Sequence, residues 1–166
     1  MDPVHFTGKE VLDMAVRIEE NGMRFYADAS KAAKSNQLKD LFRVLSEEEG
    51  THIKMFLELK KALVGDDETA GFDPYLEDAQ QYLKSMADTE VFTNPDAGKE
   101  AARSIKDEQE AISMAIGMEK DSLLFYYELE RMIREKDKKV IESLIDQEKE
   151  HVRKLTNLQN MLFGSK

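Results

Sequence analysis

The sequence LSEEEGTHIKMF at residues 45–56 places charged side chains where a helix would bury apolar ones. Leu45 and Phe56 fall on one face of a helix, and Glu49 and His52 fall on the same face, one turn apart from each other. A charged group on an apolar face is unfavourable unless it has a partner. The rest of the sequence must therefore supply a partner for Glu49 and His52.

The second half of the chain repeats the first at corresponding positions. Residues 45–53 (LSEEEGTHI) align with 144–152 (LIDQEKEHV), and residues 14–26 (MAVRIEENGMRFY) align without gaps with MAIGMEKDSLLFYY at 114–127. A duplicated helix pair explains both alignments and implies pseudo-twofold symmetry. The matched residues are Met14/Met114, Ala15/Ala115, Glu19/Glu119, Phe25/Phe125, Tyr26/Tyr126, Glu49/Glu148 and His52/His151.

Helical periodicity and capping signals predict four long helices. The first begins with a capping box at Thr7-Gly-Lys-Glu10, and the last ends just before Gly164. The predicted spans are about 7–34, 37–63, 104–135 and 137–163. The irregular connection at 65–103 contains a predicted short helix near 74–87 and a turn at Asn94-Pro95-Asp96. Two helix pairs separated by one long connection are typical of an all-α four-helix bundle with a crossover, here a single domain over residues 1–166.

Composition excludes several classes of protein and site. The chain has no Cys, which rules out disulfides, thiolate zinc sites, iron–sulfur clusters and a cysteine nucleophile. The net charge is −10 and no basic cluster interleaves with aromatic residues, so we expect no nucleic-acid partner. The start MDPVHFTGKE lacks a signal-peptide pattern, and no apolar run is long enough to span a membrane. We therefore expect a soluble, cytoplasmic protein with no membrane partner.

Apolar residues step by three and four along each predicted long helix and form core-facing stripes. Each stripe is interrupted near its middle by a carboxylate, and two stripes also contain a histidine. No Lys or Arg occupies a stripe position, although an unpaired buried ion costs several kcal/mol. The stripes are Leu12, Val16, Glu19, Met23, Tyr26; Leu38, Leu41, Leu45, Glu49, His52, Phe56, Leu59, Leu63; Ile112, Ile116, Glu119, Leu123, Tyr126; and Ile141, Leu144, Glu148, His151, Leu155, Leu158, Leu162.

Metal ions are the partners that this pattern predicts. Four carboxylates balance two divalent cations, and an imidazole completes each coordination shell. One Glu from each of two helices, with Glu-x-x-His from each of the other two, is the ligand set of carboxylate-bridged di-metal bundles. The predicted ligands are Glu19, Glu49, His52, Glu119, Glu148 and His151.

Each of these residues also has a purely structural interpretation that requires no metal. A single Glu-x-x-His in so Glu-rich a chain is usually a surface pair, but here two of the three histidines carry Glu at i−3 in register with the repeat. The third, His5, is predicted to be a surface residue. Tyr26 and Tyr126 are first of all core aromatics, although their stripe positions could let a hydroxyl reach a ligand carboxylate, and Tyr127 is a third candidate for this role. Glu48, like Glu20, falls off its stripe and is interpreted as solvated.

At these residues the chain resembles the rubrerythrin branch of the ferritin-like di-iron proteins. The resemblance covers nearly the whole chain, in the runs A-x-x-x-E-x(6)-Y at 15–26 and 115–126 and in the two E-x-x-H motifs. It implies a ferritin-like bundle with a non-haem di-iron centre that reacts with peroxide or dioxygen. Two departures stand out: there is no rubredoxin-like domain with cysteine-bound iron, and Ser122 replaces an extra ligand Glu.

The resemblance implies a di-iron oxidoreductase, either a peroxidase or a ferroxidase, with two iron ions and manganese as the other metal to consider. Glu49 and Glu148 would bridge the ions, and Glu19 and Glu119 would be terminal ligands. We expect a separate electron-donor protein and a homodimer or higher homo-oligomer. Two alternatives are left open: ferritin-like iron oxidation and storage, which requires a shell assembly, and a structural protein that keeps a vestigial site.

Overall fold

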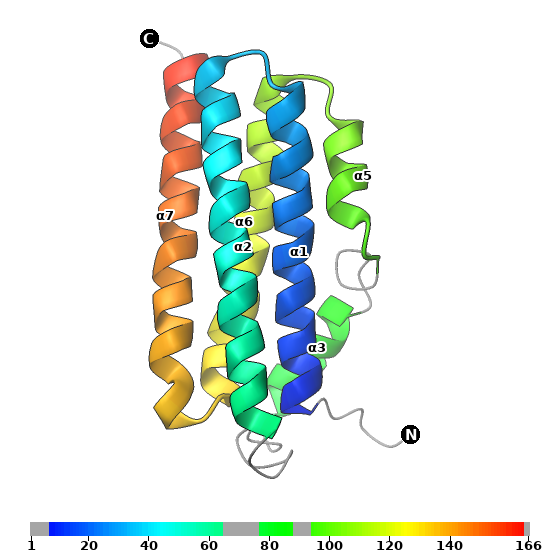
Figure 1. The fold of residues 1–166 in the computed structure, drawn as a ribbon, viewed down its shortest axis with the longest axis vertical. Helices are drawn as coiled ribbons and strands as arrows, with labels where there is room; N and C mark the ends of the chain where they lie inside the picture. The colour runs from blue at the N-terminus through cyan, green and yellow to red at the C-terminus, as the bar shows by residue number, and fades with distance from the viewer. Residues whose placement is uncertain (1–6, 65–76, 88–93, 165–166) are drawn as a thin grey trace.

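The computed structural model describes residues 7–64, 77–87 and 94–164, and all of its regular structure there is helical. Four long helices run side by side along the longest axis of the molecule (Figure 1). They are α1 (Gly8–Ala32), α2 (Asn36–Val64), α6 (Glu108–Met132) and α7 (Lys138–Phe163). The shorter elements are α3 (Glu77–Ala87), α5 (Ala97–Ser104) and the 3₁₀ helix η1 (Glu135–Asp137).

The bundle is built from two helix pairs. α1 packs mainly on α2, α6 packs mainly on α7, and α5 lies against α1. The connection from α2 to α6 carries α3 and α5 and crosses from one pair to the other. The prediction of an all-α four-helix bundle with two pairs and a crossover is therefore confirmed. Within the described ranges, no helix is both long and apolar enough to cross a membrane.

The ends of the long helices follow local capping chemistry. The predicted capping box is present, because the Thr7 hydroxyl accepts from the Glu10 amide at 3.3 Å and the Glu10 carboxylate accepts from the Thr7 amide at 2.8 Å. At the other end of the chain, α7 stops at Phe163, and Gly164 follows as the C-cap residue. Both predicted ends are confirmed, whereas residues 65–67, where the predicted irregular connection begins, lie outside the described residues.

The predicted start of the third long helix at Ser104 is wrong. Ser104 is the last residue of α5, and Ile105 has an extended backbone. The helix α6 begins only at Glu108, where the Asp107 side chain accepts from the Glu110 amide at 2.8 Å. Asp107 is thus an N-cap residue that separates two helices.

The short helix α5 was not predicted, although the turn before it was. The turn at Asn94-Pro95-Asp96 is present, and its Asn94 carbonyl accepts from the Ala97 amide at 3.2 Å. The helix then contacts α1 so closely that a Cβ on Gly98 would lie 1.9 Å from the Asn21 carbonyl oxygen. The buried Asn21 side chain accepts from the Gly98 amide and donates to the Asn94 carbonyl, both at 3.3 Å. This tertiary contact has no periodic signal in the sequence.

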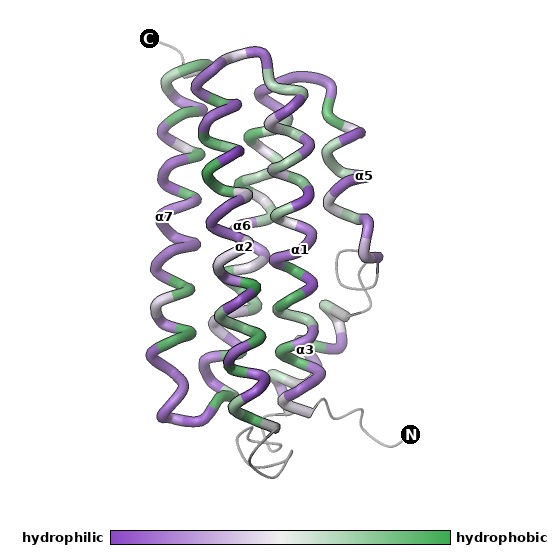
Figure 2. The backbone as a smooth tube through the Cα atoms, in the orientation of Figure 1, coloured by the Kyte–Doolittle hydropathy of each residue, from purple (hydrophilic) through white to green (hydrophobic). Residues whose placement is uncertain are grey.

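The bundle core consists of two apolar clusters, one toward each end. One includes Leu12, Phe56 and Leu144, and the other includes Phe42 and Leu155. Along each long helix, hydrophobic positions alternate with hydrophilic ones (Figure 2). Between the clusters every long helix contributes buried charged residues. The bundle therefore encloses a polar layer at mid-height.

Candidate metal centre

The four long helices bring all six predicted ligands into this buried layer. None of the six is more than 3% exposed. The two members of each Glu-x-x-His pair lie one helical turn apart and therefore share the inward face. The apolar stripes of α1 and α6 each contribute one further carboxylate to the same layer. The six residues are Glu19 on α1, Glu49 and His52 on α2, Glu119 on α6, and Glu148 and His151 on α7.

The six residues form two groups of four that share two members. In each group, one donor atom per residue lies within 4.8 Å of all the others. Glu49 and Glu148 belong to both groups, as carboxylates that bridge two ions would. The groups are Glu19, Glu49, His52, Glu148 and Glu49, Glu119, Glu148, His151.

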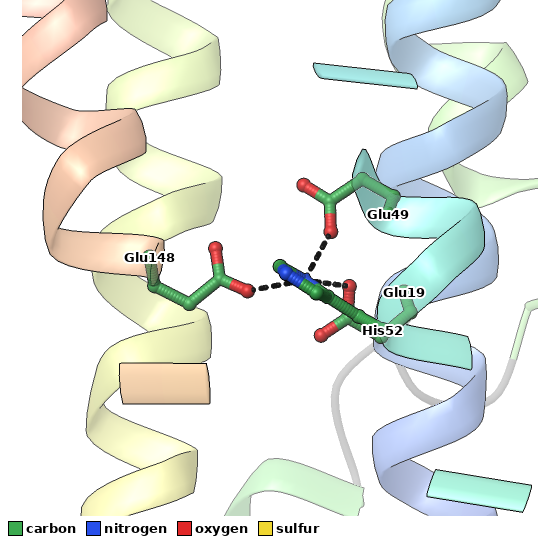
Figure 3. Close-up of side chains that lie close together, drawn as sticks. All are labelled: Glu19, Glu49, His52 and Glu148. Atoms are coloured by element: carbon green, nitrogen blue, oxygen red, sulfur yellow. Dashed lines mark hydrogen bonds and ion pairs between the residues drawn. The ribbon is translucent and has the colours of Figure 1, made fainter. Parts of the chain in front are cut away.

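In the first group, three carboxylates converge on one imidazole nitrogen (Figure 3). The Nδ1 atom of His52 lies 2.8 Å from Glu148 Oε1, 3.2 Å from Glu49 Oε2 and 3.3 Å from Glu19 Oε2. Neighbouring donors around an ion bound at about 2.1 Å are separated by about 3 Å. The donor set thus has the chemistry and the spacing of a divalent-metal site.

The second group has the same arrangement about the pseudo-twofold axis. The Nδ1 atom of His151 lies 3.1 Å from Glu148 Oε2, 3.4 Å from Glu119 Oε1 and 3.5 Å from Glu49 Oε1. The rings of His52 and His151 stack with their centroids 5.5 Å apart and their planes at 16°. The duplicated helix pair therefore yields two nearly equivalent donor sets, one on each side of the shared carboxylates.

The pKa values of the predicted ligands reflect the crowding of like charges. Burial, followed by the neighbouring Glu19 and Glu148 carboxylates, raises the pKa of Glu49 well above its ordinary value. Burial also raises the pKa of Glu119, to about 8, although a hydrogen bond from His151 opposes this shift. Glu49 and Glu119 therefore hold their protons to higher pH than an isolated glutamate does.

Two other predicted ligands, His151 and Glu148, have pKa values shifted so that their charged forms are favoured. Burial lowers the pKa of His151, but hydrogen bonds to Glu119 and Glu148 outweigh it and raise the pKa to about 12. Burial likewise opposes the shift of Glu148, whose pKa is lowered by hydrogen bonds from both histidines. These hydrogen bonds are short but poorly directed, because among the described side chains both Glu148 oxygens and His151 Nδ1 lack a partner with good hydrogen-bond alignment. Buried donor atoms left in this state fit a cation that they would share.

Two tyrosines orient the carboxylates that belong to only one group. The Tyr26 hydroxyl on α1 donates to Glu119 on α6, and the Tyr126 hydroxyl on α6 donates to Glu19 on α1. Burial and then the adjacent carboxylate charge raise the pKa of both tyrosines above 10.0, so both hydroxyls keep their hydrogens. Each half of the repeat thus positions a carboxylate of the other half. Tyr127 has no such role, because its side chain is exposed and its ring lies 5.7 Å from Lys149 Nζ.

The outer nitrogen of each histidine contacts the opposite helix. His52 Nε2 lies 3.2 Å from Gln147 Oε1 on α7, and His151 Nε2 lies 3.0 Å from Glu48 Oε2 on α2. Both Glu48 oxygens also lie 3.2 Å from Lys154 Nζ. The interpretation of Glu48 as simply solvated was therefore wrong: its side chain is 37% exposed but contacts a predicted ligand.

The contact of Gln147 with His52 was not predicted from the sequence. The repeat could have indicated it, because Gln147 aligns with Glu48 and each immediately precedes a predicted ligand Glu. Glu20, in contrast, is partly exposed and belongs to neither metal group. His5 lies outside the described residues.

A small cavity of about 40 Å³ adjoins the centre between α1 and α6. It reaches Glu19, Glu49 and Glu119, and its wall includes Gly22 and Ser122, which correspond in the repeat. The Ser122 hydroxyl donates to the Met118 carbonyl of its own helix at 3.1 Å, so it does not replace a ligand carboxylate. A cavity of this size admits one or a few water-sized molecules.

Comparison with known proteins agrees with this geometry. The sequence model of the rubrerythrin family matches residues 10–159. The fold is similar to the crystal structure of a candidate ferritin-like diiron-carboxylate protein from Thermotoga maritima, with 30% identity and a TM-score of 0.72 over 94% of this chain and 96% of that chain. A comparison with curated proteins gave no match. Because the family match spans most of the chain and the buried Glu/His layer fits it, the chain belongs to the rubrerythrin family.

Proposed function

We propose that this protein is a di-iron oxidoreductase that reduces hydrogen peroxide or dioxygen. The observation that carries the proposal is the pair of buried donor sets that share Glu49 and Glu148. Glu19 and His52 would complete one iron position, and Glu119 and His151 the other, with manganese as the alternative metal. When bound, two ferrous ions supply Lewis acidity and two electrons, which with two protons convert peroxide to two waters or dioxygen to peroxide.

The chain's own residues position the ligands and control access. Tyr26 and Tyr126 hold the unshared carboxylates by hydrogen bonds, which limits their movement. The cavity beside Gly22 and Ser122 is large enough for a molecule of two or three non-hydrogen atoms, such as peroxide or dioxygen, and too small for a larger organic substrate. A Cβ at Gly22 would lie at an ordinary contact distance, 3.6 Å, from the Glu49 carboxyl carbon, so a larger side chain at this position would take up space in the cavity.

Access through the cavity can be tested without turnover. Ser122→Leu puts a larger side chain into the cavity wall and should slow the binding of azide, a small anion whose binding changes the iron spectrum, by about tenfold or more. The control is Ser113→Leu, at an exposed position of α6 that does not line the cavity. Equal azide rates in both variants, with full metal content, would place the entry route elsewhere.

A separate protein would return electrons to the centre, and the protein would act as a homodimer or higher homo-oligomer. The chain has no Cys to hold a second iron centre, which supports an external donor. Large apolar side chains exposed on α6 support self-association, because Leu124 is 56% exposed and its neighbour Tyr127 is 42% exposed. Native mass measurement tests the oligomer.

The central experiment separates metal binding from oxidant choice. Protein purified without added iron is analysed for metal, loaded anaerobically with ferrous iron, and mixed with peroxide or air-saturated buffer in parallel. We expect two irons per chain and oxidation of both, with the faster oxidant identifying the substrate. A chain that binds no iron, or whose iron is oxidised no faster than free ferrous iron, contradicts the proposal.

Ferritin-like iron oxidation and storage is the second candidate. The near-symmetric six-residue centre, with Ser122 turned to its own helix, favours it because no seventh carboxylate faces the site from that position. Storage requires a closed shell of many subunits and retention of more than two irons per chain after repeated ferrous additions. A dimer that retains only two excludes storage.

A further inference from the structure

We propose that Glu48 and Gln147 make the two metal positions chemically unequal, with the more electron-rich position at His151. This inference rests on the proposed function, since it requires metal at both positions. The two donor sets are related by the repeat, yet the residues beyond the histidines differ in charge. Glu48 and Gln147 are thereby positioning residues that act through His151 and His52.

Both histidines present Nδ1 to the centre and Nε2 to the opposite helix. Nδ1 of His151 faces three carboxylates, and its Nε2 lies 3.0 Å from Glu48 Oε2. A metal at Nδ1 uses that nitrogen's lone pair, so the ring hydrogen resides on Nε2 and is donated outward. The ring hydrogen of His52 likewise resides on Nε2, which lies 3.2 Å from Gln147 Oε1.

The orientation of the Gln147 amide is fixed by its own helix. Its Nε2 donates to the Ser143 carbonyl at 3.2 Å and faces the Ser143 hydroxyl at 3.4 Å. This leaves the amide oxygen toward His52, where it accepts the ring hydrogen. Gln147 is therefore a neutral acceptor for one histidine.

Glu48 is a charged acceptor for the other histidine. Lys154 Nζ lies 3.2 Å from both of its oxygens and holds the carboxylate in place. The repeat places Met55 where Lys154 would have its counterpart, so the Gln147 side lacks the equivalent cation. The asymmetry thus extends over two pairs of matched positions.

A carboxylate that accepts the ring hydrogen makes the imidazole a stronger electron donor than an amide does. The ion beside His151 should therefore be bound more tightly than the ion beside His52. It should also differ from it in electronic environment, although the first-neighbour atoms of the two positions are alike. Two similar ligand sets would then bind iron in two distinguishable steps.

Exchange of the outer residues provides the test. Anaerobic titration with ⁵⁷Fe²⁺ of the full chain should show two binding constants and two Mössbauer doublets of equal area. Glu48→Gln should weaken the tighter step by about tenfold, within the range for changes beyond the metal ligands, and bring the doublets together. Gln147→Glu should also bring them together, by strengthening the weaker step. The double variant, which exchanges the two residues, should separate them again.

The matched control is Glu47→Gln, which removes a charge from the same helix at an exposed residue that pairs with Arg43. It should leave both constants and both doublets unchanged, and thermal unfolding of all variants checks that the bundle is intact. A single doublet in the unmodified protein, or two doublets that persist unchanged in both single variants, overturns this proposal. If two irons are still bound in that case, the proposed function stands. Failure to bind two irons at all overturns both.

Discussion

The Tyr26 hydroxyl on α1 donates a hydrogen bond to the Glu119 carboxylate on α6, across the gap between the two helix pairs. The repeat makes this contact reciprocal, because Tyr126 donates to Glu19 in the opposite direction. Aromatic residues of the core are thus also the groups that hold two of the proposed ligands. The apolar packing and the metal centre therefore depend on the same helix alignment.

Tyr26→Phe keeps the ring in the core but leaves Glu119 without its hydroxyl donor. We expect metal affinity to fall by about tenfold and the metal-free protein to lose about 1–3 kcal/mol of stability. Metal titration and chemical unfolding measure the two effects. Tyr127→Phe is the control, because its ring is exposed and lies against Lys149. Equal losses in both variants would mean that the Tyr26 hydroxyl has no role at the metal.

Loss of a shared carboxylate should differ from loss of a histidine. Glu49 belongs to both donor groups and His52 to only one, so Glu49→Ala should lose both metals and His52→Ala at least one. Metal analysis after gel filtration measures this loss. Glu49→Ala should also destabilise the metal-free protein less than the loaded one, because the loss of one carboxylate relieves like-charge repulsion. Full metal content in both variants would show that the ligand assignment is wrong.

Glu19 and Glu20 are adjacent in sequence but have different surroundings. Glu19 is buried within a donor group, whereas Glu20 is partly exposed and belongs to neither. Glu19→Gln should therefore reduce metal content, and Glu20→Gln, its matched control, should not. The reverse pattern would mean that α1 is rotated by about one residue.

Because position 122 is a serine and not a glutamate, both histidines should stay bound to their metals through the redox cycle. The Ser122 hydroxyl donates to Met118 of the same helix, so no extra carboxylate competes with imidazole from this position. Crystal structures of the reduced and oxidised forms should show both iron–nitrogen bonds. A shift of more than about 1 Å away from either histidine would contradict this, since ligand distances vary by about 0.2 Å. Ser122→Glu should permit such a shift and serves as the comparison.

Glu108 should stabilise the end of the bundle in a pH-dependent way. Its Oε1 accepts from the Ser35 amide at 2.7 Å and the Lys34 amide at 2.6 Å. These hydrogen bonds, that from Ser35 first, lower the pKa of Glu108 below 4.5. Glu108→Gln should cost about 1 kcal/mol at neutral pH, because the site is partly exposed.

The lowered pKa sets the direction of this pH effect. The contribution of Glu108 is complete above its unfolded pKa of about 4.5 and is lost as pH falls through the lower folded value. The difference in unfolding free energy between the natural protein and Glu108→Gln should therefore shrink below about pH 4.5. A difference that grows as the solution is acidified would contradict the assignment.

Helix content followed from local signals, and so did most helix ends. The capping box at Thr7 and the glycine at 164 act within one turn, so the sequence alone places both ends. The start of the third long helix was misplaced at Ser104, which is the last residue of the unpredicted α5, whereas the Asp107 cap begins α6 at Glu108. The contact of Gly98 with Asn21 joins segments far apart in the chain and has no local signature.

The sequence by itself determined which six residues would meet. Helical period puts Glu49 and His52 on one face, and the repeat requires Glu148 and His151 to do the same at the same level of the bundle. Only the tertiary structure decided what lies behind the histidines, as in the contact of His151 with Glu48. Such contacts depend on how each helix is rotated about its axis and on side-chain rotamers, which the packing of the whole bundle sets and the periodicity of one helix does not.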